Sequence, residues 1–163
     1  VVALRKRDDI RVLQFANDAV PRVAVEAVRA VHDHELLRHH LPRIAELEIA
    51  SNAEVPLIRR VLNANYRDGS ETAAKRVAQV ASRDDLPAAA RIEAIELLGK
   101  WAMPGQTDVV MNFYAPLADR SGDNAIEALQ QHLEKLLAST PKIARATLKA
   151  ASDYGLPSVE KQF

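Results

Sequence analysis

The segment Pro56–Asp68, which reads PLIRRVLNANYRD, decides the fold class of this chain. Its apolar residues Leu57, Ile58, Val61 and Leu62 recur three and four positions apart, a spacing that puts them on one face of a helix. Three other segments repeat this pattern of an apolar stripe behind a proline: Pro21–Asp33, Pro87–Ala102 and Pro141–Gly155. Repetition of one amphipathic unit predicts stacked helices, because no unit can bury its apolar face alone.

Each of these segments is preceded by another apolar stripe, and the preceding stripes begin near Asp8, Glu35, Ser70 and Asp123. The sequence therefore predicts an all-α protein of about four helical hairpins, with the right-handed superhelix of HEAT or armadillo repeats. Leu133 is expected to be buried in the last hairpin.

Local signals predict where these helices begin and end. Caps are expected at Ser51–Glu54, Ser70, Asp84–Asp85 and Thr140, since their side chains can accept hydrogen bonds from free amides of the next helix. Gly69 and Tyr154–Gly155 are expected helix ends, and Pro157 is expected to block continuation.

Composition excludes several classes of protein. The 163 residues suit one domain, with 48% apolar but only 4% aromatic residues and a formal net charge of zero. This balance offers no general attraction for nucleic acid or anionic lipid. The absence of cysteine excludes disulfides, thiolate metal sites and covalent haem attachment. No apolar run is long enough to span a membrane. The start at Val1-Val2, without Met, predicts a fragment of a larger multi-domain protein.

The third and fourth hairpins are separated by a longer segment, Met103–Asp123, which we call the insertion. Prolines and glycines indicate a loop, yet it carries many large apolar groups: Met103, Val109, Val110, Met111, Phe113, Tyr114 and Leu117. Such residues are rarely all exposed. One interpretation is that the insertion fills a groove between repeats. The other is a docking surface for a neighbouring domain, with Trp101, Phe113 and Tyr114 as anchors.

Four histidines lie close in sequence, His32, His34, His39 and His40, but their spacing does not suit a metal site. Neighbouring histidines on a helix point in different directions, whereas one ion is gripped by residues four apart. We expect these histidines to be solvated and the chain to bind no metal, haem or nucleotide. Asp108 and Asp119 flank the apolar part of the insertion, but no nucleophile with an oriented base accompanies them.

Two asparagines and three arginines complete the candidate residues. Asn63 and Asn65 are unusual in a helix, and Asn63 either points inward and bridges repeats through its amide or lies on the surface. Arg60, Arg91 and Arg145 occupy equivalent positions in three helices and are expected to pair with acids of adjacent helices.

Leu57–Gly69 and Arg91–Trp101 together resemble the HEAT-repeat region of large membrane-bound dehydrogenases. Val25–Asp33 and Tyr114–Leu117 also fit that region, and the resemblance extends from about Asp8 to Ala118. These proteins join an N-terminal quinoprotein-type sugar dehydrogenase β-propeller to HEAT repeats and a C-terminal cytochrome c module.

The resemblance implies a non-catalytic scaffold that positions redox modules inside an exported, periplasmic oxidoreductase. Pyrroloquinoline quinone, calcium and haem c would belong to other domains, since this chain has neither a Cys-x-x-Cys-His motif nor strand blades. The implied partners are neighbouring domains, not nucleic acid, and no direct membrane insertion is expected.

Two other functions remain open from the sequence. One is a stand-alone HEAT adaptor that binds a peptide or protein in its concave groove. The other, a HEAT-like DNA glycosylase, is disfavoured because there is no basic track and no distinct catalytic acid.

Overall fold

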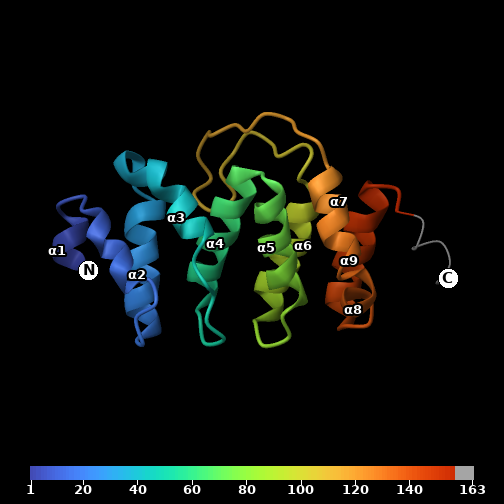
Figure 1. Cartoon of the computed structure of the whole chain (residues 1–163), viewed down its shortest axis with the longest axis horizontal. Helices are drawn as coiled ribbons and strands as arrows, with labels where there is room; N and C mark the ends of the chain where they lie inside the picture. The colour runs from blue at the N-terminus through green and yellow to red at the C-terminus, as the bar shows by residue number, and fades with distance from the viewer. Residues whose placement is uncertain (157–163) are drawn as a thin grey trace.

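The computed structural model of the protein describes residues 1–156, and within this range it contains helices, turns and loops but no β-strand (Figure 1). The only strand-like feature among these residues is an isolated antiparallel bridge between Thr107 and Tyr114. The predicted all-α class is therefore confirmed. Pro157, the expected stop after the last helix, lies outside the described residues.

The helices follow one another along the chain with short connections, apart from the one that contains the insertion. In order, they are α1 (Val2–Arg5), the 3-10 helix η1 (Ile10–Phe15), α2 (Pro21–His32), the 3-10 helix η2 (Glu35–His40), α3 (Leu41–Ala45), α4 (Val55–Asp68), α5 (Glu71–Ser82), α6 (Ala88–Gly99), α7 (Asp123–Gln130), α8 (Leu133–Leu137) and α9 (Pro141–Asp153).

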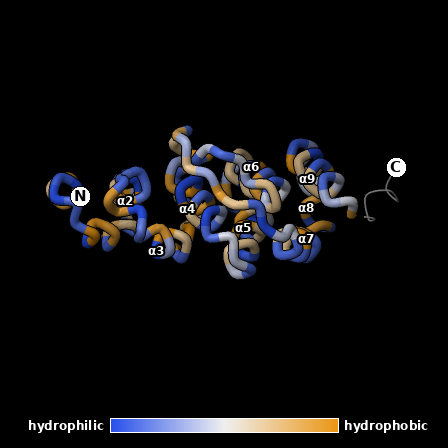
Figure 2. Tube along the Cα trace, turned by 90° about the horizontal axis from the view of Figure 1, so that it is seen from above, coloured by the Kyte–Doolittle hydropathy of each residue, from blue (hydrophilic) through white to orange (hydrophobic). Residues whose placement is uncertain are grey.

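The longer helices stand side by side along the long axis of the molecule (Figure 1). Seen from above, α2, α4, α6 and α9 form one row, and α3, α5 and α7 lie in a second row beside it (Figure 2). Within the first row, α2 packs against α4, α4 against α6, and α6 against α9. The row of neighbours is the arrangement expected when the proline-led helices each bury one apolar face against the next.

The buried apolar residues form two clusters instead of one central core. Helix α4 belongs to both, because Leu57, Val61 and Ala64 enter the N-terminal cluster, while Ile58, Leu62 and Tyr66 enter the C-terminal one. Leu133 is buried in the C-terminal cluster, as predicted. Small alanines fill much of both clusters and let neighbouring helices approach closely.

Several helix ends follow the local signals. Gly69 ends α4 with a left-handed φ of 73°, and Ser70 Oγ accepts a 3.2 Å hydrogen bond from the Ala73 amide at the start of α5. Pro21, Pro56 and Pro141 each lie in the first turn of a helix, where a missing amide hydrogen costs little. Gly155 follows α9 with a positive φ of 64°.

At three of the predicted caps no side-chain cap hydrogen bond forms. Helix α4 begins after Glu54 without a side-chain cap, and Ser51 lies in a turn before it. Helix α6 begins after Pro87, because the carboxylates of Asp84 and Asp85 are engaged by basic side chains instead. Thr140 occupies the N-cap position of α9, but its side chain makes no cap hydrogen bond.

The first helices of the first two hairpins are shorter than predicted. The Asp8–Asn17 stripe forms only the 3-10 helix η1, and the stripe from Glu35 is divided between η2 and α3. Pro42, in the first turn of α3, lacks the amide hydrogen that would continue a helix from η2. After α3 ends at Ala45, residues 46–54 form a non-helical connector to α4.

Candidate functional site

The connection between α6 and α7 runs out over the ends of α4 and α5 towards α3 and then returns to α7 (Figures 1 and 2). It comprises Lys100–Gly122 and so contains nearly all of the insertion. Val109 and Leu117 pack against the C-terminal cluster. The insertion therefore lies against the helices, as one of the two interpretations expected.

Trp101 fixes the base of this connection. Its side chain is completely buried and meets the ring of Tyr66 edge to face, with the ring centroids 5.6 Å apart. Tyr66 Oη donates a 3.0 Å hydrogen bond to the Lys100 carbonyl, and burial raises the pKa of this phenol to about 12. Trp101 is consequently an internal support, and it has no surface to offer a partner.

Arg120 joins the outgoing and returning ends of the connection. Its guanidinium lies 4.3 Å from the centroid of the Trp101 ring and donates to the carbonyls of Trp101 and Tyr66 at 2.9 and 2.7 Å. Its backbone amide donates to the Ala102 carbonyl at 3.0 Å. A planar guanidinium can stack on an aromatic ring and bind carbonyls simultaneously, so one side chain holds both ends together.

Asp108 fixes the far part of the insertion. Its carboxylate is buried and accepts hydrogen bonds from Arg38 of η2 and Asn63 of α4, both at 3.0 Å. The amides of Val110 and Met111 donate to its other oxygen at 3.0 and 2.9 Å. Burial alone would raise the pKa of Asp108, but these hydrogen bonds outweigh it and lower the pKa below its ordinary value.

The hydrogen bonds continue from Asp108 into α2. Asn63 Nδ2 lies 2.9 Å from His32 Nε2, and His32 Nδ1 lies 2.8 Å from Asp33 Oδ1. Asp33 also pairs with Arg60 of α4, whose Nε is 2.9 Å from Oδ1. We call His32, Asp33, Arg60, Asn63 and Asp108 the polar network. Because Asn63 Nδ2 donates to both neighbours, the arrangement suits a His32 ring that accepts at Nε2 and donates from Nδ1.

The polar network resolves one open alternative and corrects one expectation. Asn63 is buried and bridges α4, α2 and the insertion, so its inward orientation is confirmed. His32, expected to be solvated, is only 1% exposed, because Asn63 and Asp33 supply partners for both ring nitrogens. His39 is exposed as expected, while His34 and His40 are half-buried.

The remaining polar candidates, Asn65 and three arginines, differ in the contacts that they make. Buried Asn65 donates from Nδ2 to the carbonyls of Ala45 and Val61. The expected pairing of Arg60 with an acid of an adjacent helix is confirmed by Asp33. Arg91 pairs instead with Asp84, in the turn before its own helix, at 3.0 Å. Exposed Arg145 pairs with no acid among residues 1–156.

The outer side of the insertion presents apolar groups to solvent. Tyr114 is 72% exposed and Phe113 is 40% exposed, with the Arg38 guanidinium 4.5 Å from the Phe113 ring centroid. We call Phe113 and Tyr114 the docking patch. A cavity of about 400 Å³ adjoins it and is lined by both aromatics together with Asp33, Glu35 and Arg38. Arg38 thus connects the docking patch with buried Asp108.

Sequence reasoning missed Arg38, Arg67 and Arg120 as parts of this site. Arg67 lies 3.5 Å from Asp108, and its Nη1 donates to the Ala115 carbonyl. The sequence offered one signal, because Asp108 stands alone beside the apolar residues of the insertion. A carboxylate that is buried with such residues needs cationic partners. The identity of those partners depended on the fold.

The carboxylates of the polar network, Asp33 and Asp108, are already occupied by arginine, asparagine or histidine. Among residues 1–156, no group of three or more histidine, aspartate or glutamate side chains is placed to hold a metal ion. Within the same residues, no helix combines the length and apolarity needed to cross a membrane.

A scan against protein-family models and searches of curated proteins and of solved structures found no match to this chain.

Proposed function

We propose that this chain is the non-catalytic HEAT-repeat scaffold of a membrane-bound, periplasmic dehydrogenase. Its helix pairs would form a right-handed superhelix, and the insertion would contact a neighbouring domain. The sequence resemblance at Leu57–Gly69 and Arg91–Trp101 motivates the assignment. In this role, a stiff stack of helices sets the distance between a quinone-dependent propeller and a cytochrome c module.

The observation that carries the proposal is the docking patch on an insertion fixed at both ends. Phe113 and Tyr114 are exposed, while Asp108 and Trp101, which precede them in the same connection, are buried. Aromatic side chains on a preorganised surface bind partners strongly, because little conformational freedom is lost on association.

The proposal is tested with the domains encoded on either side of this chain, produced as separate polypeptides. Binding of each domain is measured by titration calorimetry with the wild type and with the Phe113→Ala/Tyr114→Ala variant. Loss of two aromatic anchors should raise Kd roughly thirtyfold for one of the domains. Val2→Ala, which trims an apolar side chain that is 68% exposed at the other end of the molecule, is the matched control.

If the double variant binds both domains with the affinity of the wild type, Phe113 and Tyr114 have no docking role. The dehydrogenase assignment has its own test, because the neighbouring domains should include a propeller and a Cys-x-x-Cys-His module. Turnover of sugars or alcohols by this chain alone, supplied with pyrroloquinoline quinone, calcium and an artificial electron acceptor, would contradict the scaffold role.

A further inference from the structure

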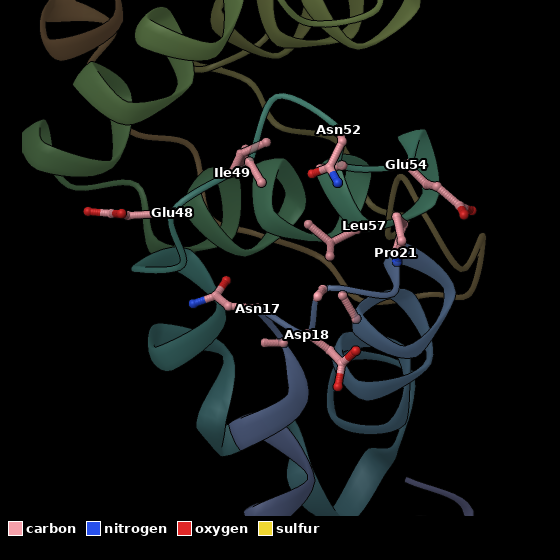
Figure 3. A pocket seen from close by; sticks show the side chains of 13 residues that line it. Asn17, Asp18, Pro21, Glu48, Ile49, Asn52, Glu54 and Leu57 are labelled. Atoms are coloured by element: carbon pink, nitrogen blue, oxygen red, sulfur yellow. The ribbon is translucent and has the colours of Figure 1, made fainter.

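A groove lies between α2 and α4 at the ends of these helices opposite to the insertion. Its volume is about 390 Å³, within the range of small-ligand and peptide pockets. It is bounded by the turn before α2 on one side and by connector 46–54 on the other (Figure 3). Apolar groups line its inner part: Ala16, Ala24, Ile49, Ala53 and Leu57.

The groove exists because the first helical part of the second hairpin ends early, at Ala45. Helix α3 ends at Ala45, and the extended connector that follows is much narrower than a helix, whose diameter with side chains is about 10 Å. The side of the connector that faces α2 is therefore left open. Leu57 of α4 lines the inner end of the opening, where it is 5% exposed.

The rim of the groove is acidic. Asp18, Glu48 and Glu54 line it, and none of the described residues that line it is basic. Figure 3 shows Glu48 and Glu54 at opposite ends of the groove, with Leu57 between them and Asp18 on the far wall. Glu48 and Glu54 are exposed and form no ion pair within residues 1–156. The molecule has no net charge, so this negative potential is local.

The first turns of α2 and α4 also face the groove, and helix N-termini ordinarily attract anions. Here, however, Pro21 and Pro56 remove one amide donor from each first turn. The amides of Val23 and Leu57 already donate within their own turns. With few donors left, the three carboxylates determine the charge that the groove prefers.

We propose that this groove binds a short basic segment of a partner protein. An apolar side chain of the segment packs over Leu57 and Ala53, and its lysine or arginine side chains reach Glu48 and Glu54. Charge complementarity and the apolar lining together favour such a segment over a free cation, which would leave the inner part uncovered. The inference does not depend on the docking patch or on the dehydrogenase assignment.

The test is fluorescence anisotropy with labelled hexapeptides. One alternates lysine and leucine, and a second alternates glutamate and leucine. The basic peptide should bind the wild type with an affinity that falls as salt rises, whereas the acidic one should not bind. Glu48→Gln/Glu54→Gln should raise Kd for the basic peptide roughly tenfold, since each exposed ion pair contributes modestly.

The matched control is Glu96→Gln/Glu134→Gln, which removes the same charge from exposed positions on α6 and α8. It should leave Kd within roughly twofold of the wild type. Equal weakening by both double variants would show general electrostatic attraction and overturn the proposal. Absence of binding by the basic peptide to folded protein would overturn it too, as would stronger binding of inorganic phosphate than of the basic peptide.

Discussion

At the scale of single residues, Asp108 has the most consequential position. It is the only residue of the insertion whose carboxylate is buried, and it connects the loop to η2 and α4 through Arg38 and Asn63. Asp108 also accepts hydrogen bonds from the amides of Val110 and Met111 in its own turn. The same side chain therefore shapes the loop and attaches it to the helices.

Asp108→Ala is expected to destabilise the protein by about 3–5 kcal/mol, because it leaves the partly buried cations Arg38 and Arg67 without their carboxylate. Urea unfolding measures the change. Asp119→Ala is the matched control, since Asp119 is exposed in the same loop and should change stability by less than about 0.5 kcal/mol. Similar values for the two variants would contradict the anchoring role.

Asp33 predicts a pH dependence of stability. Burial would raise its pKa, but hydrogen bonds from His32 and Arg60 prevail and lower the pKa to about 2. A carboxyl group with a depressed folded pKa stabilises the protein above its unfolded pKa of about 4 and loses this contribution as the pH falls towards 2.

The contribution is on the order of 2 kcal/mol, and it should disappear between about pH 4 and pH 2. Unfolding free energies measured along this range for the wild type and Asp33→Asn provide the check. The variant should be less stable at pH 6 and should lose less stability on acidification. Parallel curves would mean that Asp33 has an ordinary pKa.

At the scale of elements, the turn after α4 and the returning end of the insertion depend on each other. A Cβ at Gly69 would lie 2.1 Å from Arg120 Nη1, and the φ of 73° is itself unfavourable for other residues. Arg120 can therefore hold the two ends of the connection only because position 69 has no side chain.

Gly69→Ala should destabilise the protein by about 1 kcal/mol for its backbone alone and by more because Arg120 must move. It should also speed trypsin cleavage after Arg120. Gly105→Ala isolates the backbone effect, since Gly105 has a φ of 72° but no atom within 4 Å of its Cβ position. If the two variants behave alike in both assays, Arg120 does not hold the connection.

The elements also show what the sequence can and cannot predict. Gly69, Ser70 and the helix prolines act through residues within one turn, so the ends of most long helices were predictable. The division of the second hairpin at Pro42 was missed because the apolar stripe continues through it. The pairing of Arg38 with Asp108 was beyond sequence reasoning, since 70 positions separate them and many arginines compete for the same acid.

At the scale of the whole molecule, the insertion adds a connection, besides α4, between the N-terminal and C-terminal parts of the stack. Its base at Trp101 lies in the C-terminal cluster, while Asp108 reaches Arg38 of η2 and, through Asn63, His32 of α2. The buried tryptophan and aspartate thereby give the exposed docking patch a fixed position on the stack of helices.

The most direct test of this account is amide hydrogen exchange resolved by residue. Within residues 104–118 of the insertion, five amides donate to internal acceptors: those of Asp108, Val110, Met111, Asn112 and Ala115. If the insertion is fixed, these amides should exchange far more slowly than in an unstructured peptide, and Asp108→Ala should abolish the protection while amides of α6 remain protected. Exchange at the unstructured rate in the wild type would contradict the central claim that the insertion is an ordered surface.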